Sequence, residues 1–91
     1  MIADNRDESL LKFPCQFPVK AMGKSGPELE KAILEIVGRH VPELTEGAVK
    51  FVASKNGTYT SITVTISAQS KQQLDNIYQD LTACVHVLYA L

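Results

Sequence analysis

The chain has 91 residues, 45% of them hydrophobic and 21% charged, and nine Lys and Arg against ten Asp and Glu give a formal net charge of −1. This length suits one domain with a single core and is too short for two. Like charges form no block along the chain, so we expect no nucleic-acid partner, because contact with a phosphate backbone normally needs a basic patch.

Residues 1–12 are charged and lack a repeating apolar pattern, which predicts a flexible N-terminal tail. We expect residues 13–91 to form the single domain. No apolar run approaches the roughly 20 residues of a membrane span, and acidic residues stand near the N-terminus where a signal peptide would be apolar. We therefore expect a cytoplasmic protein with no membrane partner.

The first expected element is a strand over residues 15–24. Apolar side chains occupy every second position from Phe17 to Ala21, whereas Lys20 lies on the other side. Pro18 stands within this run, and proline cannot donate a hydrogen bond to a sheet. Its nitrogen must therefore lie near the start of the strand or where no neighbouring strand needs a donor.

A helix is expected next. Ser25 and Glu28 form the S-x-x-E pattern of a capping box, in which each side chain accepts a hydrogen bond from the backbone of the first turn. Apolar residues then recur at spacings of three and four from Leu29 to Val41, so one stripe of the helix is apolar. Pro42 ends this helix.

Residues 49–68 carry the strongest structural signal, two β-rich runs on either side of Asn56-Gly57. This dipeptide readily supplies the two positive φ angles of a type I′ turn and predicts a β-hairpin. The turn sets the register, with Lys55 opposite Thr58 and, farther out, Val49 opposite Val64. The side expected to face the core carries Val49, Phe51, Ala53, Ile62, Val64 and Ile66. The other side carries Lys50, Val52, Ser54, Tyr59, Ser61, Thr63, Thr65 and Ser67.

A second cap pattern, Ser70 with Gln73, predicts a second amphipathic helix that ends near Ala83. The apolar run over residues 85–91 predicts a last strand. Its expected inward residues are Val85, Val87, Tyr89 and Leu91, and its outward residues are His86 and Leu88.

The resulting order, β-α-β-β-α-β, is that of a two-layer α+β sandwich with a ferredoxin-like fold. Right-handed crossovers place the first and third strands in the centre of a four-stranded antiparallel sheet and both helices on one face. The other face of the sheet has no layer of its own.

Three segments, FPCQFPVKAMG, SKNGTYTSITVTI and the C-terminal V-x-V-L-x-x-L, closely resemble the YbeD-like family of small bacterial proteins. The resemblance extends from Phe13 to Leu91. The residues that carry it are Phe17, Lys20, Met22, Gly23, Gly57, Tyr59 and Ser61. It implies a ferredoxin-like sandwich similar in fold to the ACT regulatory domains, which bind amino acids at subunit interfaces, and it implies no characterised function.

The loop after the first strand is the candidate ligand site. Its glycines and the helix N-terminus behind it offer backbone N–H groups to a small anion, and a lysine on the neighbouring strand could meet a carboxylate or phosphate. The candidate residues for a small-molecule effector are Lys20, Gly23, Lys24, Ser25 and Gly26. A glycine, a cap and a proline are also what any strand-to-helix turn needs. ACT-type sites usually have an acidic residue before the glycine of this loop, where this chain has Lys24-Ser25.

The uncovered sheet face is the candidate interaction surface. Its candidate residues are Met22, Val52, Tyr59, Ser61, Thr63 and Leu88. Serine and threonine are ordinary solvent-facing residues of an open sheet, but the apolar members of this set favour a homodimer contact or a protein partner.

The sequence contains no pattern typical of an enzyme, metal site or cofactor site. His40 and His86 lie on separate elements, and neither has another ligand residue at zinc-site spacing. Cys15 and Cys84 are expected near opposite ends of adjacent strands, as small buried side chains without a disulfide. The function hypothesis is a non-enzymatic regulatory or adaptor domain that senses a small metabolite. The alternative is a protein-interaction module with no ligand.

Overall fold

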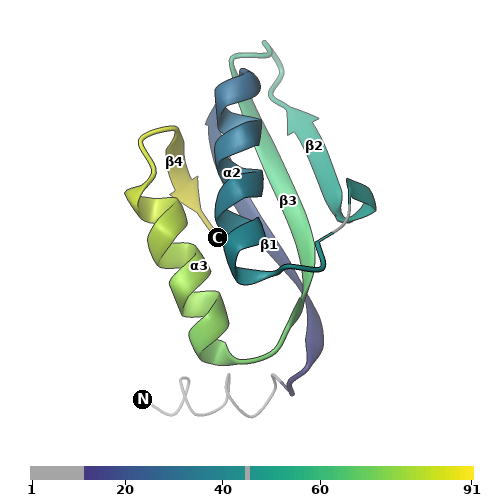
Figure 1. The fold of residues 1–91 in the computed structure, drawn as a ribbon. Helices are drawn as coiled ribbons and strands as arrows, with labels where there is room; N and C mark the ends of the chain where they lie inside the picture. Colours follow the sequence, from purple (N-terminus) through teal and green to yellow (C-terminus); the bar gives the residue numbers. More distant parts are fainter. Residues whose placement is uncertain (1–11, 45) are drawn as a thin grey trace, which may run out of the picture.

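The computed structural model describes residues 12–44 and 46–91, so the expected tail lies outside the described residues except for Lys12. The elements are β1 (Cys15–Lys24), α2 (Pro27–His40), the 3-10 helix η1 (Glu46–Ala48), β2 (Val49–Ala53), β3 (Tyr59–Ala68), α3 (Lys71–Ala83) and β4 (Val87–Ala90). The strands form one antiparallel sheet in the order β2-β3-β1-β4, and both helices lie on one face of it (Figure 1). The predicted ferredoxin-like sandwich is therefore confirmed.

The core lies between the helices and the two central strands. Its side chains come from the apolar stripes of the helices and from alternate positions of the strands. The largest fully buried side chains are Leu29, Ile33, Ile62, Ile66, Ile77, Leu81, Val19, Val37 and Val64. Each such burial contributes about 1.5–3 kcal/mol before entropy is counted. Within the described part of the chain, no helix is long and apolar enough to cross a membrane.

The position of Pro18 in the central strand β1 follows from hydrogen-bond alternation. Lys20 exchanges both backbone hydrogen bonds with Leu91, so even-numbered residues of β1 bond toward β4. The nitrogen of Pro18 points to the same side, two residues beyond this last pair. No ladder donor is required there, as the sequence predicted.

The hairpin has the predicted register but a different turn. Val49 to Ala53 pair with Val64 to Thr60 as expected. The carbonyl oxygen of Ser54 accepts a hydrogen bond from the Gly57 N–H at 2.9 Å, and only Gly57 in this turn has a positive φ, 74°. A type I′ turn needs a positive φ at Asn56 as well, so that prediction is wrong.

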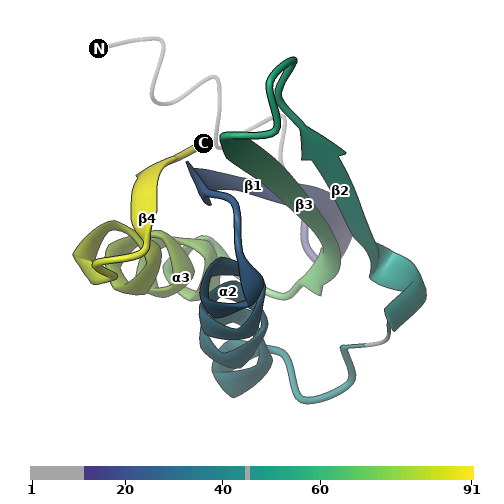
Figure 2. The same ribbon diagram turned by 90° about the horizontal axis from the view of Figure 1, so that it is seen from above.

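Strand β2 extends beyond the helices, which lie over the other strands (Figure 2). Phe51 and Ala53 point toward the helix side, but both are exposed, Phe51 to 49%. Their predicted place in the core is wrong because the two helices lie over the other strands and leave most of β2 uncovered. Val49, at the start of β2, does pack against the core.

The first helix begins without the predicted capping box. Its N-cap is Gly26, with a φ of 152° and no side-chain cap. Ser25 instead bonds to Thr60 of β3, Oγ to Oγ1 at 2.7 Å. The second cap is confirmed, since the Ser70 hydroxyl accepts a hydrogen bond from the Gln73 N–H at 3.1 Å.

Strand β4 is shorter than predicted and has an irregular register. Met22 faces Tyr89, but the next residue, Gly23, faces Val87, so Leu88 is an extra residue at a bulge. The bulge shifts the alternation by one residue. Val87 is buried as predicted, but Tyr89 lies with Met22 on the side away from the helices.

The other predicted inward residues of this segment are also corrected. Leu91 pairs with Lys20 on the side away from the helices, and Val85 precedes β4 and is 88% exposed. Strict alternation from a sequence cannot reveal where a bulge will fall, which accounts for Leu91. Val85 is exposed for another reason: it lies in the turn before β4, where the Val87 N–H donates to the Cys84 carbonyl at 3.1 Å.

Candidate functional site

The candidate site is the sheet face opposite α2 and α3, which we call the open face. Residues from all four strands reach it because alternate side chains of each strand point away from the helices. Its members are Gln16, Pro18, Lys20, Met22, Lys24, Lys50, Val52, Tyr59, Ser61, Thr63, Thr65, Ser67, Tyr89 and Leu91. Five of the six predicted interaction residues lie on this face, and the sixth, Leu88, is the bulge residue beside it.

One row of the open face is largely apolar. Val52 faces Ser61, Ser61 faces Met22, and Met22 faces Tyr89, so the row crosses the sheet from edge to edge. We call these four residues the apolar rung. Val52 is 59% exposed and Tyr89 48% exposed. Apolar surface therefore meets solvent at both ends of this row, and half-buried Met22 and Ser61 lie between them.

The next row is basic at two of its four positions. Lys50 faces Thr63, Thr63 faces Lys20 and Lys20 pairs with Leu91. On the other side of the apolar rung, β1 ends at Lys24, whose side chain also belongs to the open face. The open face thus has lysines on both sides of the apolar rung, and none of its strand residues is Asp or Glu.

A shallow hollow adjoins the basic row. Its volume is about 650 Å³, and its lining includes Gln16, Lys50, Thr63 and Thr65. These side chains offer ammonium, hydroxyl and amide donors. The hollow suits a carboxylate or another hydrogen-bond acceptor.

The five predicted ligand residues do not share one surface. Lys20 and Lys24 point to the open face. Gly23 is buried on the opposite side, against the carbonyl of His86. Gly26 begins the helix near the end of the hairpin.

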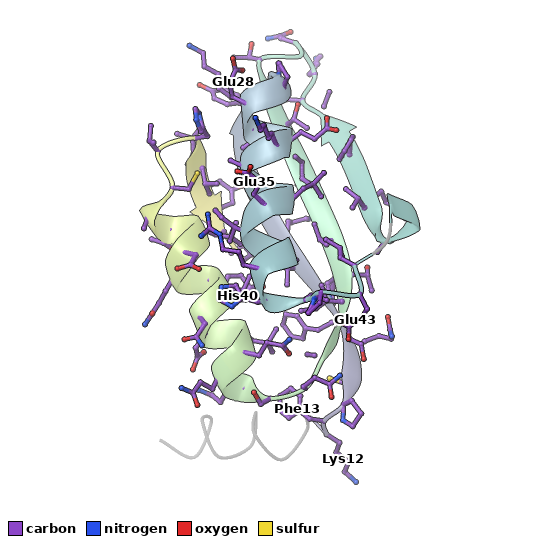
Figure 3. All side chains as sticks on the ribbon, in the orientation of Figure 1. Lys12, Phe13, Glu28, Glu35, His40 and Glu43 are labelled. Carbon is purple, nitrogen blue, oxygen red and sulfur yellow. The ribbon has the colours of Figure 1, made fainter. Side chains whose placement is uncertain are left out.

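In the loop between β1 and α2, a backbone donor is already hydrogen-bonded within the protein, and a carboxylate of the chain lies at the helix N-terminus. The Ser25 N–H donates to the Thr58 carbonyl at 2.9 Å, and Pro27 has no N–H. The Glu28 carboxylate lies beside Gly26, 3.0 Å from where a β-carbon would be, at the N-terminal end of α2 (Figure 3). A negative side chain is favourable there because the helix dipole is positive at this end.

The histidines and cysteines of the described residues do not lie together in one site. His40 lies at the C-terminal end of α2 (Figure 3), and its Nε2 is 2.7 Å from Oδ2 of Asp80 on α3. Cys15 and Cys84 are free and half-buried, and both pack against the core. Within residues 12–44 and 46–91, no group of three or more His, Cys, Asp or Glu is arranged to hold a metal.

Comparison with known proteins places the chain in a family. A family model described as "Protein of unknown function (DUF493)" matches residues 8–91. The chain belongs to this family. DUF493 relatives include a UPF0250 protein of Paraburkholderia phytofirmans, 46% identical over 76 residues, which are 84% of this chain and 85% of the relative. Another is from Chromobacterium violaceum, 44% identical over 81 residues, 89% of this chain and 90% of the relative.

A solved structure supports the fold of this DUF493 chain. The solution structure of protein HP0495 from H. pylori superimposes with a TM-score of 0.70, at 15% sequence identity, over 89% of this chain and 85% of the other. The resemblance to small bacterial YbeD-like proteins is confirmed by the family and its relatives. Their names assign no activity.

Sequence reasoning assigned two members of the open face, Tyr89 and Leu91, to the wrong side. Both were assigned inward because the bulge at Leu88 was not foreseen. The signal for the bulge is Gly23 opposite β4, since a glycine in a strand often accompanies a bulge or a close backbone approach.

Proposed function

We propose that this domain is a non-enzymatic adaptor or regulatory domain that binds a protein partner through its open face. The apolar rung is the observation that carries the proposal. Its outer members, Val52 and Tyr89, are 59% and 48% exposed. Leu91, 68% exposed, lies beside Tyr89 in the next row and adds apolar surface there. Contiguous apolar surface is favourable to bury and is a common mark of interaction sites.

A solvated face is the simpler alternative, and serine and threonine at Ser61 and Thr63 fit it. The apolar rung does not fit a solvated face, because exposure of apolar side chains such as Val52 and Met22 to water is unfavourable. The arrangement in one row also matters, since a partner segment can cover all four side chains of the rung at once. Scattered apolar residues would give no such strip.

A small-molecule effector, expected from the resemblance to ACT domains, has weaker support in this geometry. In the loop expected to bind the effector, the Ser25 N–H already donates to the Thr58 carbonyl. The Glu28 carboxylate lies beside Gly26, where an anionic ligand was expected. We therefore propose protein binding as the primary role.

The two neighbours Phe51 and Val52 allow a matched test. Both lie on β2 with similar exposure, 49% and 59%, but their side chains point to opposite sides of the sheet. A photo-crosslinking residue, p-benzoylphenylalanine, is placed at either position and the protein is irradiated in its bacterial host. We expect covalent adducts with another protein from position 52 and none from position 51. The adducts from position 52 should decrease when wild-type protein, which lacks the photo-crosslinking residue, is co-expressed. Equal adducts from both positions, or none from position 52, would contradict the proposal.

A further inference from the structure

We infer that the occupant of the open face is an acidic segment of another protein, with an apolar side chain between two carboxylates. This inference rests on the proposed function and adds the chemistry of the partner. It follows from the charges beside the apolar rung and from the hollow next to them.

The charges on β1 have a regular spacing. Lys24, Met22 and Lys20 are alternate residues on the open side of one strand. Alternate residues of a strand lie about 6.6 Å apart. An extended segment on this strand has the same spacing, so the pattern acidic-x-apolar-x-acidic places an apolar side chain on Met22 and a carboxylate near each lysine.

The hollow provides a further place for an acidic side chain. Lys50 and Thr63 belong to both the basic row and the lining of the hollow. A carboxylate that enters it meets an ammonium group and hydroxyl donors, which together favour the ionised form. The partner can therefore be acidic beyond the two positions next to the apolar side chain.

A second copy of this chain fits the open face poorly. If two open faces met, lysines of both copies would be desolvated together, and the face has no Asp or Glu to pair with them. The carboxylates of the helix layer, such as Glu28 and Glu35 (Figure 3), belong to a different surface. A contact between that surface and the open face is heterologous and would tend to form open chains of molecules, not a closed dimer.

Nucleic acid also fits less well than an acidic protein segment. Sheets that bind single strands stack bases on aromatic side chains of the central strands. On this face the middle of both central strands offers Met22, Lys20, Ser61 and Thr63. The two tyrosines of the face lie away from this region, Tyr59 at the hairpin end of β3 and Tyr89 on the edge strand β4.

The test uses a phage library of random dodecapeptides selected on the immobilised full chain. We expect enriched peptides with the acidic-x-apolar-x-acidic pattern. Their affinity should fall at least about tenfold in Lys20→Glu/Lys24→Glu, as expected for removal and reversal of two charge contacts. It should also fall between low and high salt. Lys31→Glu/Lys71→Glu, with the same charge change on the helices, is the control and should bind like wild type.

The outcomes separate this inference from the proposed function. If Val52→Asp abolishes binding but the Lys20→Glu/Lys24→Glu variant binds as tightly as wild type, the open face binds and the acidic partner is wrong. If neither variant weakens binding, both proposals fail. Dimerisation of the protein alone by analytical ultracentrifugation that Val52→Asp prevents would identify a second copy as the occupant and overturn the inference. Tighter binding of a 12-nucleotide single strand than of any selected peptide would overturn it as well.

Discussion

Gly23 and His86 approach so closely that a β-carbon on Gly23 would lie 2.2 Å from the His86 carbonyl oxygen. The same β-carbon would be 2.7 Å from Cδ1 of Leu29 in the first turn of α2. The glycine therefore lets the segment before β4 and the start of α2 close on the central strand. This packing accounts for Gly23 without a ligand.

Gly23→Ala should destabilise the domain strongly. Overpacking a core usually costs about 1–3 kcal/mol, and we expect at least the upper end because the obstacle is backbone. Urea unfolding measures the change. Gly38→Ala is the control, since a β-carbon at Gly38 meets nothing within 4 Å, and in a helix it should stabilise by up to about 1 kcal/mol. Equal effects of the two substitutions would show that the close approach at Gly23 is absent.

The sequence was sufficient to predict the elements whose patterns are local and regular. Alternation and helical periodicity identified all four strands and both helices, and counting outward from the hairpin turn gave the correct pairing of Val49 with Val64. The register survives the error in turn type because Ser54 still lies opposite Tyr59, and its N–H donates to the Tyr59 carbonyl at 2.7 Å. The pairing of the hairpin strands was therefore predicted correctly although the type of turn was not.

The errors arise where tertiary geometry decides. Phe51 has the pattern of a core residue, but coverage depends on where the helices lie on the sheet. Tyr89 was assigned inward because a bulge shifts alternation without any change in composition. Ser25 has the sequence of a cap, but its hydroxyl bonds to Thr60, which is far away along the chain and lies on the neighbouring strand β3. The prediction of the open face contains the most errors, because two of its apolar residues, Tyr89 and Leu91, follow the bulge.

The hairpin turn makes a prediction that separates the two turn types. Gly57→Ala should cost about 1 kcal/mol, because Gly57 has a φ of 74°, which is unfavourable for other residues. Asn56→Ala should cost a few tenths of a kcal/mol, because Asn56 does not have a positive φ. In a type I′ turn both substitutions would be costly. Thermal and urea unfolding of the two variants give the comparison, and equal losses would favour the type I′ turn.

The His40–Asp80 pair should couple the two helices. Their side chains are 23% and 41% exposed and 2.7 Å apart, so screening is incomplete and we expect a coupling of about 0.5–1 kcal/mol. A double-mutant cycle with His40→Ala and Asp80→Ala at a pH near 6 measures it. The control cycle is Lys71–Asp75, an exposed pair 3.4 Å apart within α3, for which about 0.3 kcal/mol is expected. A smaller coupling for His40–Asp80 than for Lys71–Asp75 would contradict this prediction.

Tyr78 should make the domain sensitive to alkali. Burial raises the pKa of its phenol, and a backbone hydrogen bond at Lys20 opposes this less strongly; the hydroxyl also donates to the Leu91 carbonyl. Because the folded chain holds this proton more tightly, the stabilisation is complete below the unfolded pKa of about 10 and is lost as pH rises through the folded value. Tyr78→Phe should lose about 1 kcal/mol at pH 8, and its free energy of unfolding should then fall less than that of wild type between pH 8 and 11. Tyr59→Phe, at the exposed end of the hairpin, removes a phenol from the surface and should keep the full alkaline fall; if both variants lose stability in parallel with wild type, Tyr78 is not the group responsible.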